Sequence, residues 1–91
     1  MSTKVCKRAL YEGRVQGVGF RFTAVEVAAG YTVAGWVRNL PTGEVEIIAE
    51  GVADQVDGFL AAVAERMAGN ITRTTVQDAP SPGHYGFFVR R

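Results

Sequence analysis

The amino-acid sequence predicts an α+β fold in which two helices cover one face of an antiparallel sheet. Three observations predict this class. Segments with alternating apolar and polar residues indicate strands, two segments with apolar residues every three or four positions indicate helices, and turns containing glycine or proline separate them. The order of the segments, βαββαβ, is that of the ferredoxin-like or split βαβ arrangement.

Length and composition favour a single domain over residues 1–91. The chain is 47% hydrophobic, enough for a buried core, and its net charge of +1 excludes a broad basic surface for nucleic acid. The longest uncharged runs are too short to span a bilayer, and the single cysteine, Cys6, excludes an intrachain disulfide or a multi-cysteine metal site. We therefore expect a cytoplasmic monomer without metal or cofactor, which binds neither nucleic acid nor membrane.

The first predicted strand runs from about Val5 to Val15 and leads into a glycine-rich loop. Its alternation predicts one buried face, which consists of Ala9, Tyr11, Gly13 and Val15. After the loop, in which Phe20 is a core candidate, Phe22–Ala29 is predicted to form a short helix. Its buried face is expected to hold Phe22, Val25 and Ala28 or Ala29, and Gly30 suits its C-terminal end.

A β-hairpin is predicted next. Thr32–Asn39 and Glu44–Gly51 both alternate, and Leu40–Gly43 has proline and glycine where a type I turn favours them. The inward residues are expected to be Val33, Gly35, Val37, Val45, Ile47 and Ala49. The outward residues are expected to be Glu44, Glu46 and Glu50, with a small apolar cluster of Leu10, Trp36 and Ile48 on the same face.

The second helix has a continuous apolar stripe, made of Val56, Phe59, Leu60, Val63 and Met67. Asp54 is predicted to cap its N-terminus and Gly69 to follow its C-terminus, while Gly58 inside it indicates close packing or simple tolerance. Two strands are then predicted, over Ile71–Asp78 and Tyr85–Arg90, with Phe87 and Val89 as core candidates and His84 in a solvated loop.

The loop between the first strand and the first helix has the features of an anion site. Gly17 and Gly19 can reach positive φ, so that successive NH groups turn inward, and the helix that follows directs its free NH groups to the same place. Arg21 adds a planar fork of donors that matches two phosphate oxygens. This predicts a site for a small phosphorylated group.

Two common nucleotide motifs are excluded at this loop. The Walker pattern requires Gly-Lys-Ser/Thr at its end, where this sequence has Gly19, Phe20 and Arg21. The dinucleotide fingerprint requires a third glycine, and Phe22 occupies that position. Glycine spacing alone would also fit a structural loop without a ligand.

Two stretches of the sequence carry a resemblance to a known family. Gly13-Arg-Val-Gln-Gly-Val-Gly-Phe-Arg21 and Gly35-Trp-Val-Arg-Asn-Leu-Pro-Thr-Gly-Glu-Val-Glu46 closely resemble the two signatures of the acylphosphatases, in the same order and at a similar separation. The resemblance extends over nearly the whole chain. It implies hydrolysis of the carboxyl–phosphate bond of acyl phosphates, without metal or covalent intermediate, with inorganic phosphate as product and inhibitor.

The resemblance also implies roles for particular residues. The predicted phosphate-binding set consists of Gln16, Gly17, Val18, Gly19, Phe20 and Arg21, and Asn39 is expected to position the attacking water. The fold supports this pairing, because a crossover through the first helix makes the first two strands parallel, so that their carboxyl ends meet at one edge of the sheet.

Two other functions found with this fold fit the sequence less well. A phosphate-binding module without turnover would be expected to lack Arg21 or Asn39, and the sequence has both. A ferredoxin-like RNA-binding domain needs aromatic residues on a basic sheet face, and the glutamates of the predicted hairpin argue against it.

Overall fold

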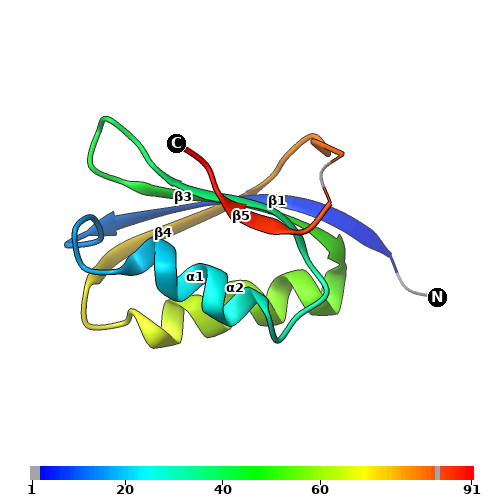
Figure 1. Cartoon of the computed structure of the whole chain (residues 1–91), viewed down its shortest axis with the longest axis horizontal. Coiled ribbons are helices and arrows are strands. Elements are labelled where there is room, and N and C mark those ends of the chain that lie inside the picture. Colours follow the sequence, from blue (N-terminus) through cyan, green and yellow to red (C-terminus); the bar gives the residue numbers. More distant parts are fainter. Residues whose placement is uncertain (1–2, 84) are drawn as a thin grey trace.

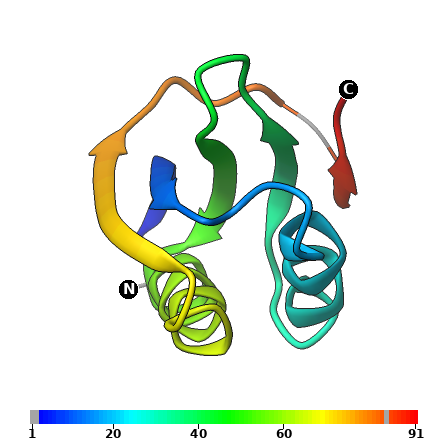
Figure 2. The same ribbon diagram turned by 90° about the vertical axis from the view of Figure 1, so that its left-hand side faces the viewer.

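The computed structural model describes residues 3–83 and 85–91. Its elements are β1 (Lys4–Gly13), α1 (Phe20–Ala28), β2 (Ala34–Asn39), β3 (Val45–Val52), α2 (Ala53–Arg66), β4 (Ile71–Asp78) and β5 (Phe87–Val89). The strands form one sheet in the order β4-β1-β3-β2-β5, and both helices pack on the same face of it (Figure 1; Figure 2). The ferredoxin-like α+β prediction is confirmed.

The direction of the strands places the two predicted motifs at one end of the sheet. β3 is antiparallel to both β1 and β2, so β1 and β2 are parallel to each other. Their carboxyl ends therefore lie at the same edge, where Figure 1 shows the loop after β1 and the hairpin after β2.

The sheet is mixed, whereas the sequence predicted an antiparallel one. β5 pairs in parallel with β2, in the register Gly35↔Phe87 to Val37↔Val89. The NH of Gly35 donates to Gly86 O at 2.9 Å, and the NH of Arg90 donates to Val37 O at 2.9 Å. These bonds occupy the edge of β2 that would otherwise be open.

The predicted inward faces of the strands and of α2 are confirmed, except at Gly13, which is exposed at the end of β1. The fully buried strand residues include Ala9, Tyr11, Val37, Val45, Ile47 and Ala49, and α2 buries Val56, Phe59, Leu60, Val63 and Met67. Inside α2, a Cβ on Gly58 would lie 2.9 Å from Cε1 of Tyr31, so this glycine permits close packing. Phe87 packs against the core, but Val89 is 40% exposed and is not part of it.

The predicted face of α1 is confirmed at Ala28 and is wrong at Phe22. The helix begins at Phe20, two residues before the predicted start, and buries Phe20, Ala24 and Ala28. These positions are four residues apart and form one stripe. Phe22 therefore falls off the stripe and is 72% exposed, while the ring of Phe20 packs on Tyr11 with 5.0 Å between centroids.

Several predicted ends of elements also differ. α2 begins at Ala53 without a side-chain cap, so Asp54 lies in the first turn instead of capping the helix. Gly69 is not among the glycines with positive φ, and the helix ends at Met67 with φ −110°. β1 ends at Gly13, at a bulge where φ is 126°, and the last strand spans three residues instead of six. His84 lies outside the described residues.

Glu46 is buried, although the sequence predicted that it faces solvent. Its side chain is 3% exposed, and its carboxylate accepts hydrogen bonds from Nε of Arg8 and Nε of Arg38, both at 2.6 Å, and from Trp36 at 3.3 Å. Burial raises the pKa of Glu46, but the hydrogen bonds from Arg38, Arg8 and Trp36 outweigh it, so the pKa lies below its ordinary value. The positive charges of Arg8 and Arg38 compensate the carboxylate, which explains why an acidic residue can be buried on this face.

Candidate active site

The loop before α1 has the conformation of an anion-binding nest. Gly17 and Gly19 have φ of 75° and 81°, and Gly19 occupies the N-cap position of α1 in the left-handed conformation. Within residues 3–83 and 85–91, no group accepts a hydrogen bond from the backbone NH groups of residues 16–22. These free NH groups and the positive end of the helix dipole favour an anion at this point.

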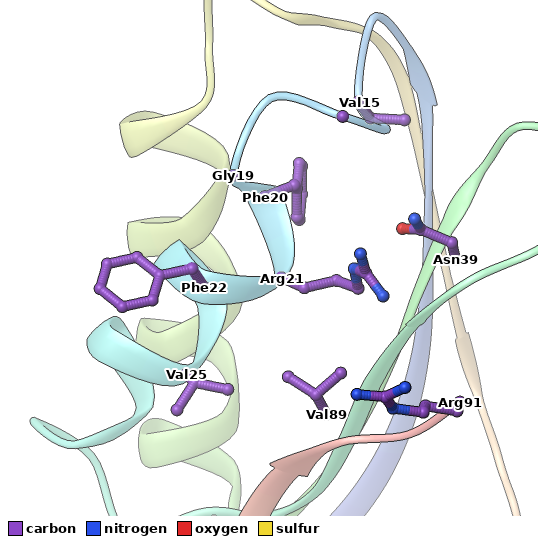
Figure 3. A pocket seen from close by; sticks show the side chains of 10 residues that line it. Val15, Gly19, Phe20, Arg21, Phe22, Val25, Asn39, Val89 and Arg91 are labelled. Carbon is purple, nitrogen blue, oxygen red and sulfur yellow. The ribbon is translucent and has the colours of Figure 1, made fainter.

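A cavity of about 460 Å³ opens beside this loop. Its walls come from α1, the end of β2 and the end of the chain, and Figure 3 shows the side chains that line it. The lining residues are Val15, Gly17, Gly19, Phe20, Arg21, Phe22, Val25, Asn39, Val89 and Arg91. The structure thus brings Arg21 and Asn39 together with most of the predicted loop.

Arg21 is available to bind an anion. Its side chain extends from the first turn of α1 toward the end of β2, as Figure 3 shows. In the part of the chain that the structure describes, no carboxylate pairs with its guanidinium, whereas Arg8 and Arg38 are both paired with Glu46. An unpaired arginine beside a nest of NH groups forms a site that complements phosphate in both charge and hydrogen bonding.

Asn39 presents an unused hydrogen-bond acceptor. It is the last residue of β2, and the hairpin after it is closed by hydrogen bonds from Leu40 NH to Glu44 O at 2.8 Å and from Gly43 NH to Leu40 O at 3.1 Å. The Oδ1 atom of Asn39 is buried and has no partner among the described residues. A buried acceptor without a partner is costly, which indicates that something else normally fills the place.

Gln16 and Val18 do not line the cavity. The Nε2 of Gln16 donates to Leu40 O at 2.8 Å and to Glu44 O at 2.9 Å, so its side chain ties the loop to the hairpin that follows Asn39. The NH groups of both residues still belong to the loop, and their part in phosphate binding stays a prediction.

Arg91 lines the cavity but was not predicted as a site residue. The other lining residues outside the predicted site were predicted to be buried in the core: Val15, Phe22, Val25 and Val89. Val89 and Arg91 reach the cavity because β5 runs parallel to β2, which brings the residues after β5 close to Asn39. Only the parallel pairing of β5 with β2 would have placed these residues in the site. The sequence of a three-residue strand does not specify which strand it pairs with.

No Asp or Glu side chain lines the cavity. Within the described residues there is also no group of three or more His, Cys, Asp and Glu that could hold a metal ion. The phenol of Tyr11 lies behind Phe20, and burial raises its pKa, so this hydroxyl is protonated at neutral pH. Within the same residues, no helix is long and apolar enough to cross a membrane.

Comparisons with known proteins agree with this geometry. The acylphosphatase family model matches residues 7–89. The chain is 38% identical over 84 residues to an acylphosphatase of Methanospirillum hungatei, covering 90% of this chain and 92% of that protein. It is 39% identical over 94 aligned positions to an acylphosphatase of Pseudomonas aeruginosa, covering 97% and 98% of the two.

A solved structure supports the same assignment. The crystal structure of acylphosphatase from Bacillus subtilis superposes with a TM-score of 0.84 at 34% identity, over 96% of this chain and 99% of that one. The match of the family model and the similarity over full-length relatives leave one assignment. The chain belongs to the acylphosphatase family of hydrolases.

Proposed function

We propose that this chain hydrolyses the carboxyl–phosphate bond of acyl phosphates to a carboxylate and inorganic phosphate. In this proposal the NH groups of the loop from Gln16 to Phe20 and the guanidinium of Arg21 bind the phosphoryl group. Asn39 positions the water that attacks phosphorus. The positive φ of Gly17 and Gly19, the free NH groups and the unpaired arginine support the first assignment.

The single observation that carries the second assignment is the unpartnered Oδ1 of Asn39. A phosphate dianion has only acceptor atoms, so it offers nothing to an amide oxygen, whereas water has protons to donate. A water that donates one O–H to Oδ1 keeps the lone pairs of its oxygen free to attack phosphorus. This assigns water to Asn39 and phosphate to the loop and Arg21.

The reaction follows from these positions. The water oxygen forms a bond to phosphorus as the bond to the acyl oxygen breaks, and the electron pair leaves with the carboxylate. The proton of the water passes to a phosphate oxygen, since no carboxylate side chain lines the cavity to accept it. A carboxylate is a good leaving group, so positioning and charge stabilisation account for most of the catalysis.

The remaining expectations concern the setting of the enzyme. We propose that it acts as a monomer in the cytoplasm on a small-molecule substrate, without metal or cofactor. The cavity is formed within one chain, which supports a monomer. Gel filtration during turnover would test this, and an active species of twice the mass would contradict it.

One assay tests the function. Purified protein should release phosphate from acetyl or benzoyl phosphate and should leave a phosphate monoester intact, with inorganic phosphate as a competitive inhibitor. Addition of a chelator should leave the rate unchanged. Equal activity on the monoester, or activity that needs a divalent ion, would contradict the proposal.

A further inference from the structure

The cavity extends beyond the proposed phosphate site to Arg91. We infer that this extension binds the acyl group, and that Arg91 favours acyl phosphates whose acyl chain carries a second anionic group. The inference rests on the proposed hydrolysis of acyl phosphates and adds the class of substrate.

The placement of Arg91 follows from the sheet. β5 pairs with β2 in parallel up to Val37↔Val89, so Arg91 lies two residues beyond the last pair, as Asn39 lies two residues beyond Val37. Figure 3 shows Arg91 entering the cavity from the wall opposite α1, with its guanidinium on the same side of Arg21 as Val25 and Val89. The two cations thus enter one cavity from opposite walls.

Arg91 has no internal partner that would occupy its charge. Most other arginines are paired with carboxylates: Arg8 and Arg38 with Glu46, Arg66 with Glu26, and Arg73 with Glu12. Across residues 3–83 and 85–91, no hydrogen bond or ion pair engages the Arg91 side chain. No Asp or Glu side chain lines the cavity either. Its guanidinium is therefore available to an anion of the substrate.

The surface beside Arg91 indicates what joins the two anions. Val25 and Val89 line the cavity there, and Figure 3 shows both on the side of Arg21 that lies away from the glycine loop. A short run of methylene groups would pack on these valines without leaving a polar group unpaired. The volume of about 460 Å³ lies in the range, roughly 300–1,000 Å³, of pockets that hold small molecules. In a matching substrate, the phosphorylated carboxyl would lie at the phosphate site, a few carbons would pack on the valines, and a second anion would reach Arg91.

The expected selectivity is modest. Arg91 is exposed, so water and salt screen its attraction, and an exposed ion pair changes an equilibrium by about fivefold at most. We expect the preference to weaken as ionic strength rises, which a purely steric preference would not do.

The test compares two substrates that differ only in the terminal group. Succinyl phosphate and butyryl phosphate have acyl chains of equal length, and only the first ends in a carboxylate. Arg91→Gln should lower kcat/KM for succinyl phosphate by more than for butyryl phosphate, so that the ratio of the two values, succinyl over butyryl, falls by up to about fivefold. Arg90→Gln is the matched control, since it removes the same charge from a residue that lies over Trp36, 4.6 Å from the ring centroid, and does not line the cavity.

A second readout does not depend on turnover. The dissociation constants of phosphonopropionate and propylphosphonate, measured by titration calorimetry, compare a ligand with the second carboxylate and one without it, and a propane bisphosphonate carries a second phosphonate instead. Arg91→Gln should weaken the binding of the two ligands with a second anion by more than that of propylphosphonate. Loss confined to phosphonopropionate would assign a carboxylate-bearing acyl group, and loss confined to the bisphosphonate would assign a phosphorylated one.

The two proposals fail in different ways. If Arg91→Gln and Arg90→Gln both leave the ratio of the two substrates unchanged while butyryl phosphate is hydrolysed, the role of Arg91 is refuted and the proposed function stands. If no acyl phosphate is hydrolysed but the measured binding of the phosphonates with a second anion still depends on Arg91, the hydrolysis is refuted and anion selection stands.

Discussion

Replacing Asn39 by alanine is expected to lower turnover with little change in the stability of the fold. The Oδ1 atom of Asn39 is buried without a partner, and an unsatisfied buried acceptor costs about 1–3 kcal/mol. Alanine removes this cost but also removes packing, which is worth about 0.8 kcal/mol per methylene-sized group. Because the side chain loses several heavy atoms, the two effects should nearly cancel, and the thermal midpoint should shift by less than the roughly 4–8 °C that about 1 kcal/mol would cause in a domain of this size.

The loss of activity should be much larger than any change in stability. If Asn39 holds the attacking water, kcat and kcat/KM should fall together by about 10² or more, as for loss of one preorganised polar group. Inhibition by phosphate should change little, because the glycine loop and Arg21 remain. Thermal unfolding, phosphate inhibition and turnover should be measured on one preparation.

Asn70→Ala provides the control for this experiment. Asn70 lies in the turn between α2 and β4, does not line the cavity, and should leave kcat unchanged when replaced. The reasoning is refuted if Asn39→Ala retains near-normal kcat, or if it loses more than about 2 kcal/mol of stability. Lost phosphate inhibition with normal kcat at saturation would instead assign Asn39 to phosphate binding.

Three further variants probe the surroundings of the site. Arg21→Lys keeps the charge but loses the two-pronged donor, so kcat/KM should fall by about 10² with unchanged thermal stability; wild-type kinetics would remove Arg21 from the mechanism. Gln16→Ala loses two hydrogen bonds, of 2.8 and 2.9 Å, and should cost about 2 kcal/mol in urea unfolding and reduce kcat/KM; full activity would show that the loop holds its position without this side chain. Glu46→Gln leaves Arg8 and Arg38 unpaired and should cost about 2 kcal/mol at pH 7. Because the folded state lowers the pKa of Glu46, this contribution is complete above the ordinary carboxyl pKa of about 4.3 and is lost as the pH falls through the lowered value, so wild type and variant should converge in acid; a constant difference would contradict it.

The fold was predictable because the local patterns and the topology agree. Alternation in β2 and β3 and the stripe in α2 identify the residues that pack between the sheet and the helices, and these residues are buried. The sequence correctly makes Phe20 a core candidate, but the helix was predicted to begin at Phe22, so Phe22 was wrongly placed on the buried face of α1. The structure shows the cause, since Phe20 packs on Tyr11 across the turn at Gly19.

The site was predictable in part. Two short motifs that can be recognised in the sequence contain Gly17, Gly19, Arg21 and Asn39. The parallel course of β1 and β2 brings the two motifs together. The position of Arg91 depends on the pairing of β2 with β5. These strands are separated by about half of the chain, and no local pattern encodes their pairing. Buried Glu46 is a similar case, because its partner Arg8 comes from a different strand.

The parallel pairing of β5 with β2 also makes the two edges of the sheet unequal. It covers the outer edge of β2, so within the described residues the two edge strands are β4, which spans Ile71–Asp78, and the shorter β5 of three residues. An open strand edge is a template for pairing with another chain. The edge of β4 carries charges at Arg73 and Asp78, but Val76 between them is 47% exposed. If this protein aggregates from a nearly native state, β4 is the strand from which edge-to-edge addition would begin.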